Sequence, residues 1–210
     1  MGIVALGGDL SAERLLNAYH LGMFPWFSEG EPIMWWSPDP RFVLFPANLK
    51  VAKSMRPYFN QRKFTATYDR DFRAVITACQ EAYRPGQHGT WITQEMLEAY
   101  CQLHKLGFAH SVEVWKGDEL VGGLYGVALG RIFFGESMFA RVSNASKFGF
   151  IALVRRLHER GYTLIDCQQE TRHLASLGAE SIPRRAFLQY LAENDLTQTE
   201  KGRWTLKPEI

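Results

Sequence analysis

Residues 110–168 read HSVEVWKGDELVGGLYGVALGRIFFGESMFARVSNASKFGFIALVRRLHERGYTLIDCQ, and this stretch decides the fold of the 210-residue chain. Polar and apolar residues alternate over 110–115, and two further strand-like runs follow at 120–129 and 132–139. Short turn sequences that contain glycine separate the three runs. Such a pattern predicts a three-stranded antiparallel meander.

A long helix and a further strand come after the meander. Apolar residues recur at helical spacing from Phe148 to Leu157, Asn144 is a good N-cap, and Gly161 ends the pattern. Residues 162–168 then form the next strand. A strand, a crossover helix and another strand predict a parallel pair with a right-handed connection.

The two parallel strands should end at one edge of the sheet. Because residues two apart on a strand share a face, we expect Glu136 to point with Met138, and Asp166 with Gln168. The edge would then hold two carboxylates, an amide and a thioether around one cleft. The start of the helix, residues 144–147, offers free backbone N–H groups and one cation to an anion.

Composition limits the class of protein. With 46% hydrophobic and 13% aromatic residues, the chain can bury one good core and a small accessory domain. Cys79, Cys101 and Cys167 are odd in number and lack CxxC spacing, which favours reduced thiols over a disulfide or zinc framework. We expect no metal. Without a signal peptide or a long apolar run, the sequence predicts a cytoplasmic protein.

Positive charge gathers in one window although the net charge is only +2. Residues 41–68 contain no acidic residue. The cations in this window are Arg41, Lys50, Lys53, Arg56, Arg62 and Lys63. If Asn48 begins a helix, Lys53 and Arg56 share a face. The window suits a polyphosphate, RNA in particular, and an ordinary solvated surface is the alternative.

The first 40 residues form a smaller predicted unit. Ser11 can cap a helix whose apolar stripe lies within residues 15–19, and Gly22 can close it. Asp39-Pro40 favours extended chain, which places a domain boundary between 1–40 and 41–210. The tryptophans of this unit exceed what one helix can cover, so we expect some to face the second domain or a ligand.

Several strings, read in order, carry a family resemblance. They are VALGGDL (4–10), FPWF (24–27), WWSPDPR (35–41), GTWI (89–92), GESMF (135–139), NASK (144–147), LIDCQ (164–168) and SLGAESIPRR (176–185). Through them the chain resembles the bacterial leucyl/phenylalanyl-tRNA-protein transferases from residue 4 to about Tyr190. The resemblance implies an α+β fold, with a small N-terminal domain and a GNAT-like (acetyltransferase-like) domain with a mixed sheet.

The resemblance also implies an activity. Leucine or phenylalanine, and less readily methionine, would pass from its tRNA to the N-terminal α-amine of proteins that begin with Arg or Lys, which marks them for N-end rule degradation. The partners would be Leu-tRNA, Phe-tRNA and such proteins or peptides, with no cofactor, membrane or DNA. Family members usually carry a further segment before GGDL, and its lack could weaken substrate binding without removing the central site.

Roles for the polar residues follow from the resemblance. In the family, the residues that match Asp166 and Gln168 act on the acceptor amine. An amide accepts protons poorly, so we interpret Gln168 as an orienting group, Asp166 as its charge partner, and Glu136 as the group that holds the cationic acceptor. The alternative for Asp166 is an ordinary solvated or paired carboxylate. A Cys167 nucleophile with His173 as base is disfavoured, because strand alternation turns the thiol toward the core.

The aminoacyl side chain needs an apolar pocket. By resemblance it is lined by Trp26, Trp91, Leu124 and Met138, with Tyr19 and Tyr100 nearby. Ordinary core is the alternative for each of them. Such a pocket would discriminate weakly among Leu, Phe and Met. For the tRNA, the basic window supplies Lys53, Arg56, Arg62 and Lys63.

Two other functions are alternatives. Acetyl-CoA-dependent N-acetylation would need glycines in the loop that receives the pyrophosphate, and residues 141–147 read RVSNASK. A non-catalytic RNA-binding module would not place Glu136 and Asp166 at the centre of its surface. Both alternatives are disfavoured by these residues.

Overall fold

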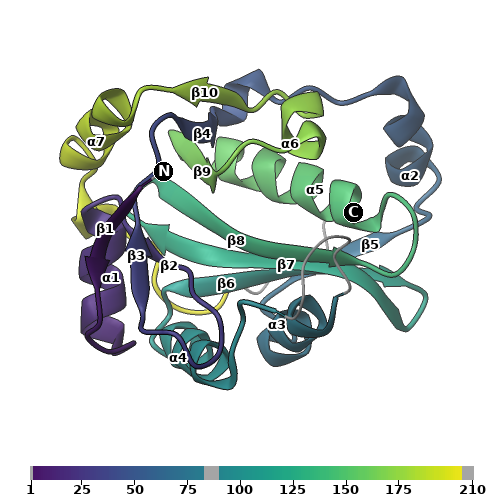
Figure 1. Cartoon of the computed structure of the whole chain (residues 1–210). Coiled ribbons are helices and arrows are strands. Elements are labelled where there is room, and N and C mark those ends of the chain that lie inside the picture. Colours follow the sequence, from purple (N-terminus) through teal and green to yellow (C-terminus); the bar gives the residue numbers. More distant parts are fainter. Residues whose placement is uncertain (1, 83–89, 205–210) are drawn as a thin grey trace.

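A seven-stranded mixed sheet forms the centre of the computed structural model, which describes residues 2–82 and 90–204 (Figure 1). Its order is β10-β4-β9-β8-β7-β6-β5. The strands are β4 (Arg41–Leu44), β5 (Thr65–Tyr68), β6 (Ala109–Lys116), β7 (Glu119–Leu129), β8 (Ile132–Ala140), β9 (Leu164–Gln168) and β10 (Glu180–Ile182). The meander β6-β7-β8 and the parallel pair β8-β9 confirm the predicted α+β class and mixed sheet. Gly89, in the GTWI string, lies outside the described residues.

Helices cover both faces of this sheet. They are α1 (Ala12–His20), α2 (Arg56–Asn60), α3 (Phe72–Glu81), α4 (Gln94–Lys105), α5 (Ala145–Glu159), α6 (Arg172–Ser176) and α7 (Arg184–Ala192), with 3-10 turns at Pro46–Asn48, Lys53–Met55 and Leu196–Gln198. One face packs on α5 and the other on α3 and α4 (Figure 1). No helix among the described residues is long and apolar enough to cross a bilayer.

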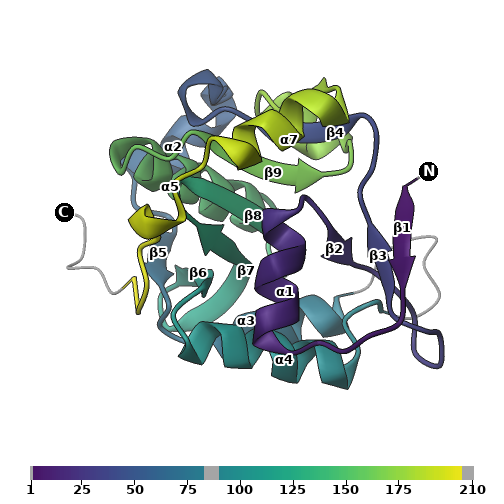
Figure 2. The same cartoon turned by 90° about the vertical axis from the view of Figure 1, so that its left-hand side faces the viewer.

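A second, three-stranded sheet stands beside α1 (Figure 2). Its strands β1 (Ile3–Leu6), β3 (Met34–Trp36) and β2 (Phe24–Pro25) are antiparallel. Its residue Trp35 and the α1 residues Leu15 and Tyr19 share an apolar cluster with α3 and α4. The division at residue 40 stays a prediction.

Helix ends show where local signals were sufficient. Ser11 accepts a hydrogen bond from the Arg14 N–H and begins α1, as predicted. Asn144 precedes α5, but its side chain does not cap the helix. Its Nδ2 donates instead to the Tyr58 hydroxyl over 3.0 Å, so the predicted N-cap position is confirmed but its side-chain hydrogen bond to the helix is not formed. The condition that a helix begins at Asn48 is not met, because a 3-10 turn ends there.

A β-bulge at Glu136 changes which side chains share a face. Tyr125 is opposite Ser137 and Gly126 is opposite Gly135, which leaves Glu136 as the extra residue of β8. Glu136 therefore faces α1 and α4, whereas Met138 packs on the α5 side. The expectation that Glu136 and Met138 point together is wrong for this reason.

Candidate active site

A cavity of about 450 Å³ opens where β8 and β9 part. The last backbone pair of this parallel ladder is Phe134 with Asp166. Beyond it, the strand ends and the first turn of α5 line the space, together with β2 and α6. This volume is in the range of small-ligand sites, and the lining is mainly apolar with a few polar groups.

Most of the predicted site residues meet at this cavity. Those that line it are Trp26, Trp91, Leu124, Glu136, Met138, Asp166 and Gln168. Tyr19 and Tyr100 are fully buried and are not among the lining residues. They lie behind Glu136 and bond to it.

Glu136 is held by neutral donors. Its carboxylate accepts from the Tyr19 hydroxyl (2.7 Å) and from Gln168 Nε2 (3.3 Å). The Tyr100 hydroxyl lies 3.2 Å from the carboxylate and also contacts the Tyr19 oxygen, and because it has one proton it donates to one of the two at a time. Burial raises the pKa of Glu136 to about 7, against the lowering effect of the two tyrosine hydrogen bonds, and the charge of Asp166 adds to the rise. A carboxylate with this pKa is partly ionised at neutral pH and can accept a proton.

The second carboxylate has a different environment. Asp166 is fully buried, and its two oxygens accept from Arg41 Nε (2.8 Å) and Nη2 (2.6 Å). Oδ1 also accepts the Gln168 N–H over 2.9 Å. The interpretation of Arg41 as part of an RNA-binding window is therefore wrong, since Arg41 has no exposed surface.

Gln168 and Cys167 at the end of β9, and His173 in α6, complete this part of the cavity wall. Gln168 has φ of 62°, in the left-handed region, and its side chain reaches Glu136. Cys167 packs on the α5 side, as alternation predicted, and also lines the cavity. Burial raises the pKa of the Cys167 thiol, so it is not a thiolate at neutral pH. His173 lines the cavity too, and burial and the charge of Lys147 lower its pKa.

The basic window continues from the α5 end of the cavity. Lys53, Arg56, Arg62 and Lys63 are all exposed, in or beside α2. The bond from Asn144 to Tyr58 joins α2 to the start of α5, where Ser146 lines the cavity. Sequence reasoning missed this link, because the two segments are 86 residues apart.

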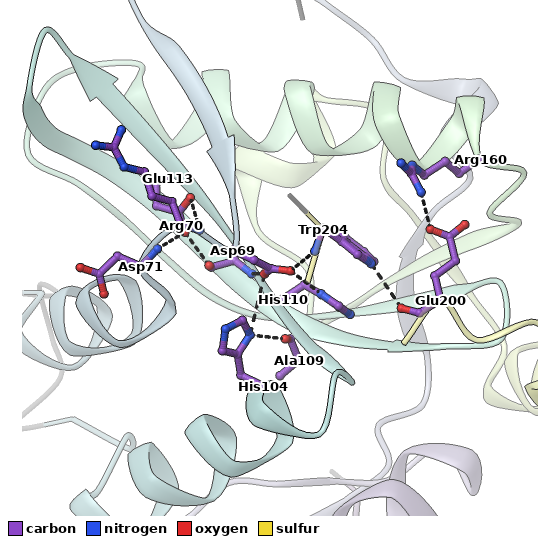
Figure 3. Close-up of polar contacts among 11 residues, drawn as sticks. Asp69, Arg70, Asp71, His104, Ala109, His110, Glu113, Arg160, Glu200 and Trp204 are labelled. Carbon is purple, nitrogen blue, oxygen red and sulfur yellow. Dashed lines mark hydrogen bonds and ion pairs between the residues drawn. The ribbon is translucent and has the colours of Figure 1, made fainter. Parts of the chain in front are cut away.

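A second polar cluster, drawn in Figure 3, is made of residues that are not among those lining the cavity. In it, Asp69 accepts the Trp204 N–H over 2.6 Å and lies 2.9 Å from His110 Nδ1, and the rings of Trp204 and His110 stack at 3.8 Å. His104 Nδ1 is 3.8 Å from the same carboxylate. The cluster fastens the C-terminal segment to β6. Among residues 2–82 and 90–204, no group of three or more His, Cys, Asp or Glu side chains could hold a metal ion.

Comparisons with known proteins agree along almost the whole chain. The family model described as leucyl/phenylalanyl-tRNA protein transferase matches residues 43–192, and the model of its N-terminal domain matches residues 8–39. A leucyl/phenylalanyl-tRNA--protein transferase of Pseudomonas fluorescens (strain Pf0-1) is 57% identical over 203 residues, 97% of this chain and 89% of the relative. That of Myxococcus xanthus (strain DK1622) is 57% identical over 204 residues, 97% and 87% of the two chains.

Structural similarity to solved proteins is weaker. A GCN5-related N-acetyltransferase from Kribbella flavida aligns with a TM-score of 0.41 and 13% identity, over 76% of this chain and 56% of that one. This likeness decides nothing by itself.

Proposed function

The chain belongs to the leucyl/phenylalanyl-tRNA protein transferase family and transfers leucine or phenylalanine from aminoacyl-tRNA to protein N-termini, and we propose that its acceptors begin with Arg or Lys. Methionine would be a poorer donor. The transfer would occur in the cytoplasm, where aminoacyl-tRNA is found, and would mark its acceptors for N-end rule degradation. In this proposal residues 1–40 form a small unit and residues 41–210 the catalytic domain.

The reaction needs positioning and one proton acceptor. The aminoacyl ester is already activated, and an α-amine has a pKa of about 7.7–8.0, so a useful fraction is neutral near pH 7.5. Its nitrogen attacks the ester carbonyl, the amide bond forms, and the tRNA hydroxyl leaves. The attacking nitrogen must lose a proton on the way, which a positioned base can accept.

We assign that proton to Glu136. The observation that carries this assignment is the position of Glu136 at the wall of the cavity among neutral donors, where burial raises its pKa to about 7. Asp166 is less suited, since both of its oxygens are already bonded to Arg41. Gln168 keeps the orienting role. An acceptor that begins with Arg or Lys brings a cation near Glu136, which favours the ionised carboxylate and so links the choice of acceptor to the base.

The donor side chain is proposed to occupy the apolar part of the cavity. Trp26 and Trp91 line it from outside the sheet, and Leu124 is paired with Met138 across β7 and β8. A pocket with apolar walls separates side chains that differ by one methylene by only about 1–3 kcal/mol, so Leu, Phe and Met should overlap as donors. The tRNA body would then extend over α2 to Lys53, Arg56, Arg62 and Lys63.

The test uses labelled Leu-tRNA and three peptides that begin with Arg, Lys or Asp. Arg and Lys peptides should receive leucine and the Asp peptide should not. Glu136→Gln should lower the single-turnover rate by about 10²- to 10⁴-fold while Leu-tRNA binding stays within a few fold. Glu119→Gln, the same change at an exposed residue of β7, is the matched control. Equal labelling of the Asp peptide refutes the acceptor, and a wild-type rate in Glu136→Gln refutes the base.

A further inference from the structure

Arg41 is a fully buried cation at a junction of three segments. Its guanidinium lies against the rings of Phe24 (4.9 Å) and Phe187 (4.6 Å), and Nη1 donates to the Gly22 carbonyl over 3.2 Å. Nε and Nη2 together grip Asp166. The side chain therefore touches the segment after α1, the helix α7 and the strand β9.

Stability alone is a weak reason for this arrangement. Taking a guanidinium and a carboxylate out of water costs several kcal/mol for each ion, and a well-packed apolar pair of similar volume is often as stable or more stable. Arginine does offer a rigid fork that fixes both oxygens of a carboxylate at once. The orientation of Asp166 is thus what the pair determines most strictly.

Asp166 is connected to Glu136 at the cavity through Gln168. Oδ1 of Asp166, which accepts from Arg41, also accepts the Gln168 N–H. Gln168 adopts its left-handed conformation at this point, which costs a residue with a Cβ about 1–2 kcal/mol. The turn directs the Gln168 amide to Glu136, over 3.3 Å.

We infer that Arg41 is a positioning residue for aminoacyl transfer: by fixing Asp166 it holds the Gln168 turn, and through it the amide that orients Glu136 and the acceptor amine. The inference rests on the proposed function, in which Glu136 receives the proton. In this arrangement Asp166 remains paired throughout and transmits position. Arg41 itself touches neither substrate.

The test is Arg41→Lys, which keeps a cation but loses the fork. The single-turnover transfer rate should fall by about tenfold or more, while the Kd for Leu-tRNA and the KM for an Arg-initiated peptide stay within about threefold. In the free enzyme, hydrogen exchange at the backbone N–H of Gln168 should become about tenfold faster, because the Asp166 carboxylate that accepts its hydrogen bond is no longer held in place. Phe187→Leu, which removes one ring from the guanidinium, should change both quantities in the same direction but less.

Arg156→Lys is the matched control. Arg156 is also buried and lies over the rings of Tyr68 (4.5 Å) and Trp204 (5.5 Å), away from the cavity lining. This variant should lose stability without changing the transfer rate or the exchange of the Gln168 amide. A loss of rate in Arg156→Lys equal to that in Arg41→Lys would show that general destabilisation explains both, and would overturn the inference.

A double-mutant cycle shows whether Arg41 acts through Asp166. If it does, Arg41→Lys should slow the Asp166→Asn variant by less than about twofold, whereas independent effects would multiply. Unchanged exchange at Gln168, or multiplied losses, would overturn the inference. Hydrogen exchange needs no substrate, so it tests the role of Arg41 in holding the Gln168 turn independently of the acceptor. If the Arg-initiated peptide proves not to be an acceptor, only the proposed function fails.

Discussion

Replacing Tyr19 with phenylalanine should displace the pH dependence of transfer without removing the base. The Tyr19 hydroxyl donates the shorter of the two tyrosine hydrogen bonds to Glu136. Burial raises the pKa of Tyr19 itself well above its ordinary value, so this hydroxyl remains a donor across the working range. Both tyrosine bonds lower the pKa of Glu136, and losing one must raise it further.

The size of the effect follows from the hydrogen bond. A bond to a charged group contributes about 1.5–3 kcal/mol, and one pH unit corresponds to 1.36 kcal/mol. Because the Tyr100 bond remains, we take the lower end of this energy range, so the acid limb of the rate profile should shift to higher pH by about one unit. From a pKa of about 7 in the wild type, the ratio of wild-type to variant rate is then about tenfold at pH 6, about fivefold at pH 7 and about 1.3-fold at pH 8.5.

The assay is single-turnover transfer of leucine to an Arg-initiated peptide from pH 6 to 8.5. The α-amine of the peptide titrates in this range as well, but equally for both enzymes, so the ratio of rates isolates Glu136. Tyr162→Phe, the same change at a buried tyrosine outside the cavity lining, should give a ratio near one throughout. A ratio for Tyr19→Phe that does not vary with pH would refute the role of Glu136 as base.

Three further outcomes are expected. Asp166→Asn should cut the transfer rate by about 10² or more with Leu-tRNA binding within a few fold, and a wild-type single-turnover rate would contradict it. Replacing Lys53 and Arg56 together by Gln should make the salt dependence of tRNA binding shallower, by about 0.7–0.9 in the slope of log K against log salt concentration for each lost phosphate contact. The same change at the exposed pair Lys105 and Lys116 is the control, and an unchanged slope in the first variant would place the tRNA elsewhere. Burial lowers the pKa of His110 below its ordinary 6.5, so the stability that His110 contributes is complete above pH 6.5 and declines as the pH falls below it. In urea unfolding, the free energy of unfolding should therefore fall less between pH 7.5 and pH 5.5 in His110→Gln than in the wild type. Equal decreases in the two proteins would refute this.

Local patterns predicted the centre of the fold well. The alternation in residues 110–115 and the helical spacing from Phe148 to Leu157 each depend on neighbours in sequence, and β6 and α5 form there. The bulge at Glu136 depends on the opposite strand. Gly126 comes so close to Phe134 that an added Cβ would lie 2.2 Å from its carbonyl oxygen. A glycine within a strand signals such an approach, but not which residue of the partner strand is left over.

The fate of Arg41 shows what sequence proximity cannot supply. No acidic residue follows Arg41 in the chain before Asp69, which suggested a surface for RNA. Its partner Asp166 is 125 positions away and meets it only because β4 pairs with β9. The apolar residues after Arg41 were a signal, since a continuous apolar run indicates a strand buried on both faces. Arg41 is the first residue of that strand, β4, in which all four residues are buried.

The two carboxylates of the cavity are separated by the charge of their donors. A cation holds Asp166 by both of its oxygens. Neutral hydroxyls and an amide hold Glu136. Burial and, to a smaller extent, the charge of Asp166 raise the pKa of Glu136 to about 7. In the proposed mechanism the proton acceptor is therefore Glu136 on β8, and β9 supplies geometry, the reverse of the division that the sequence alone suggested.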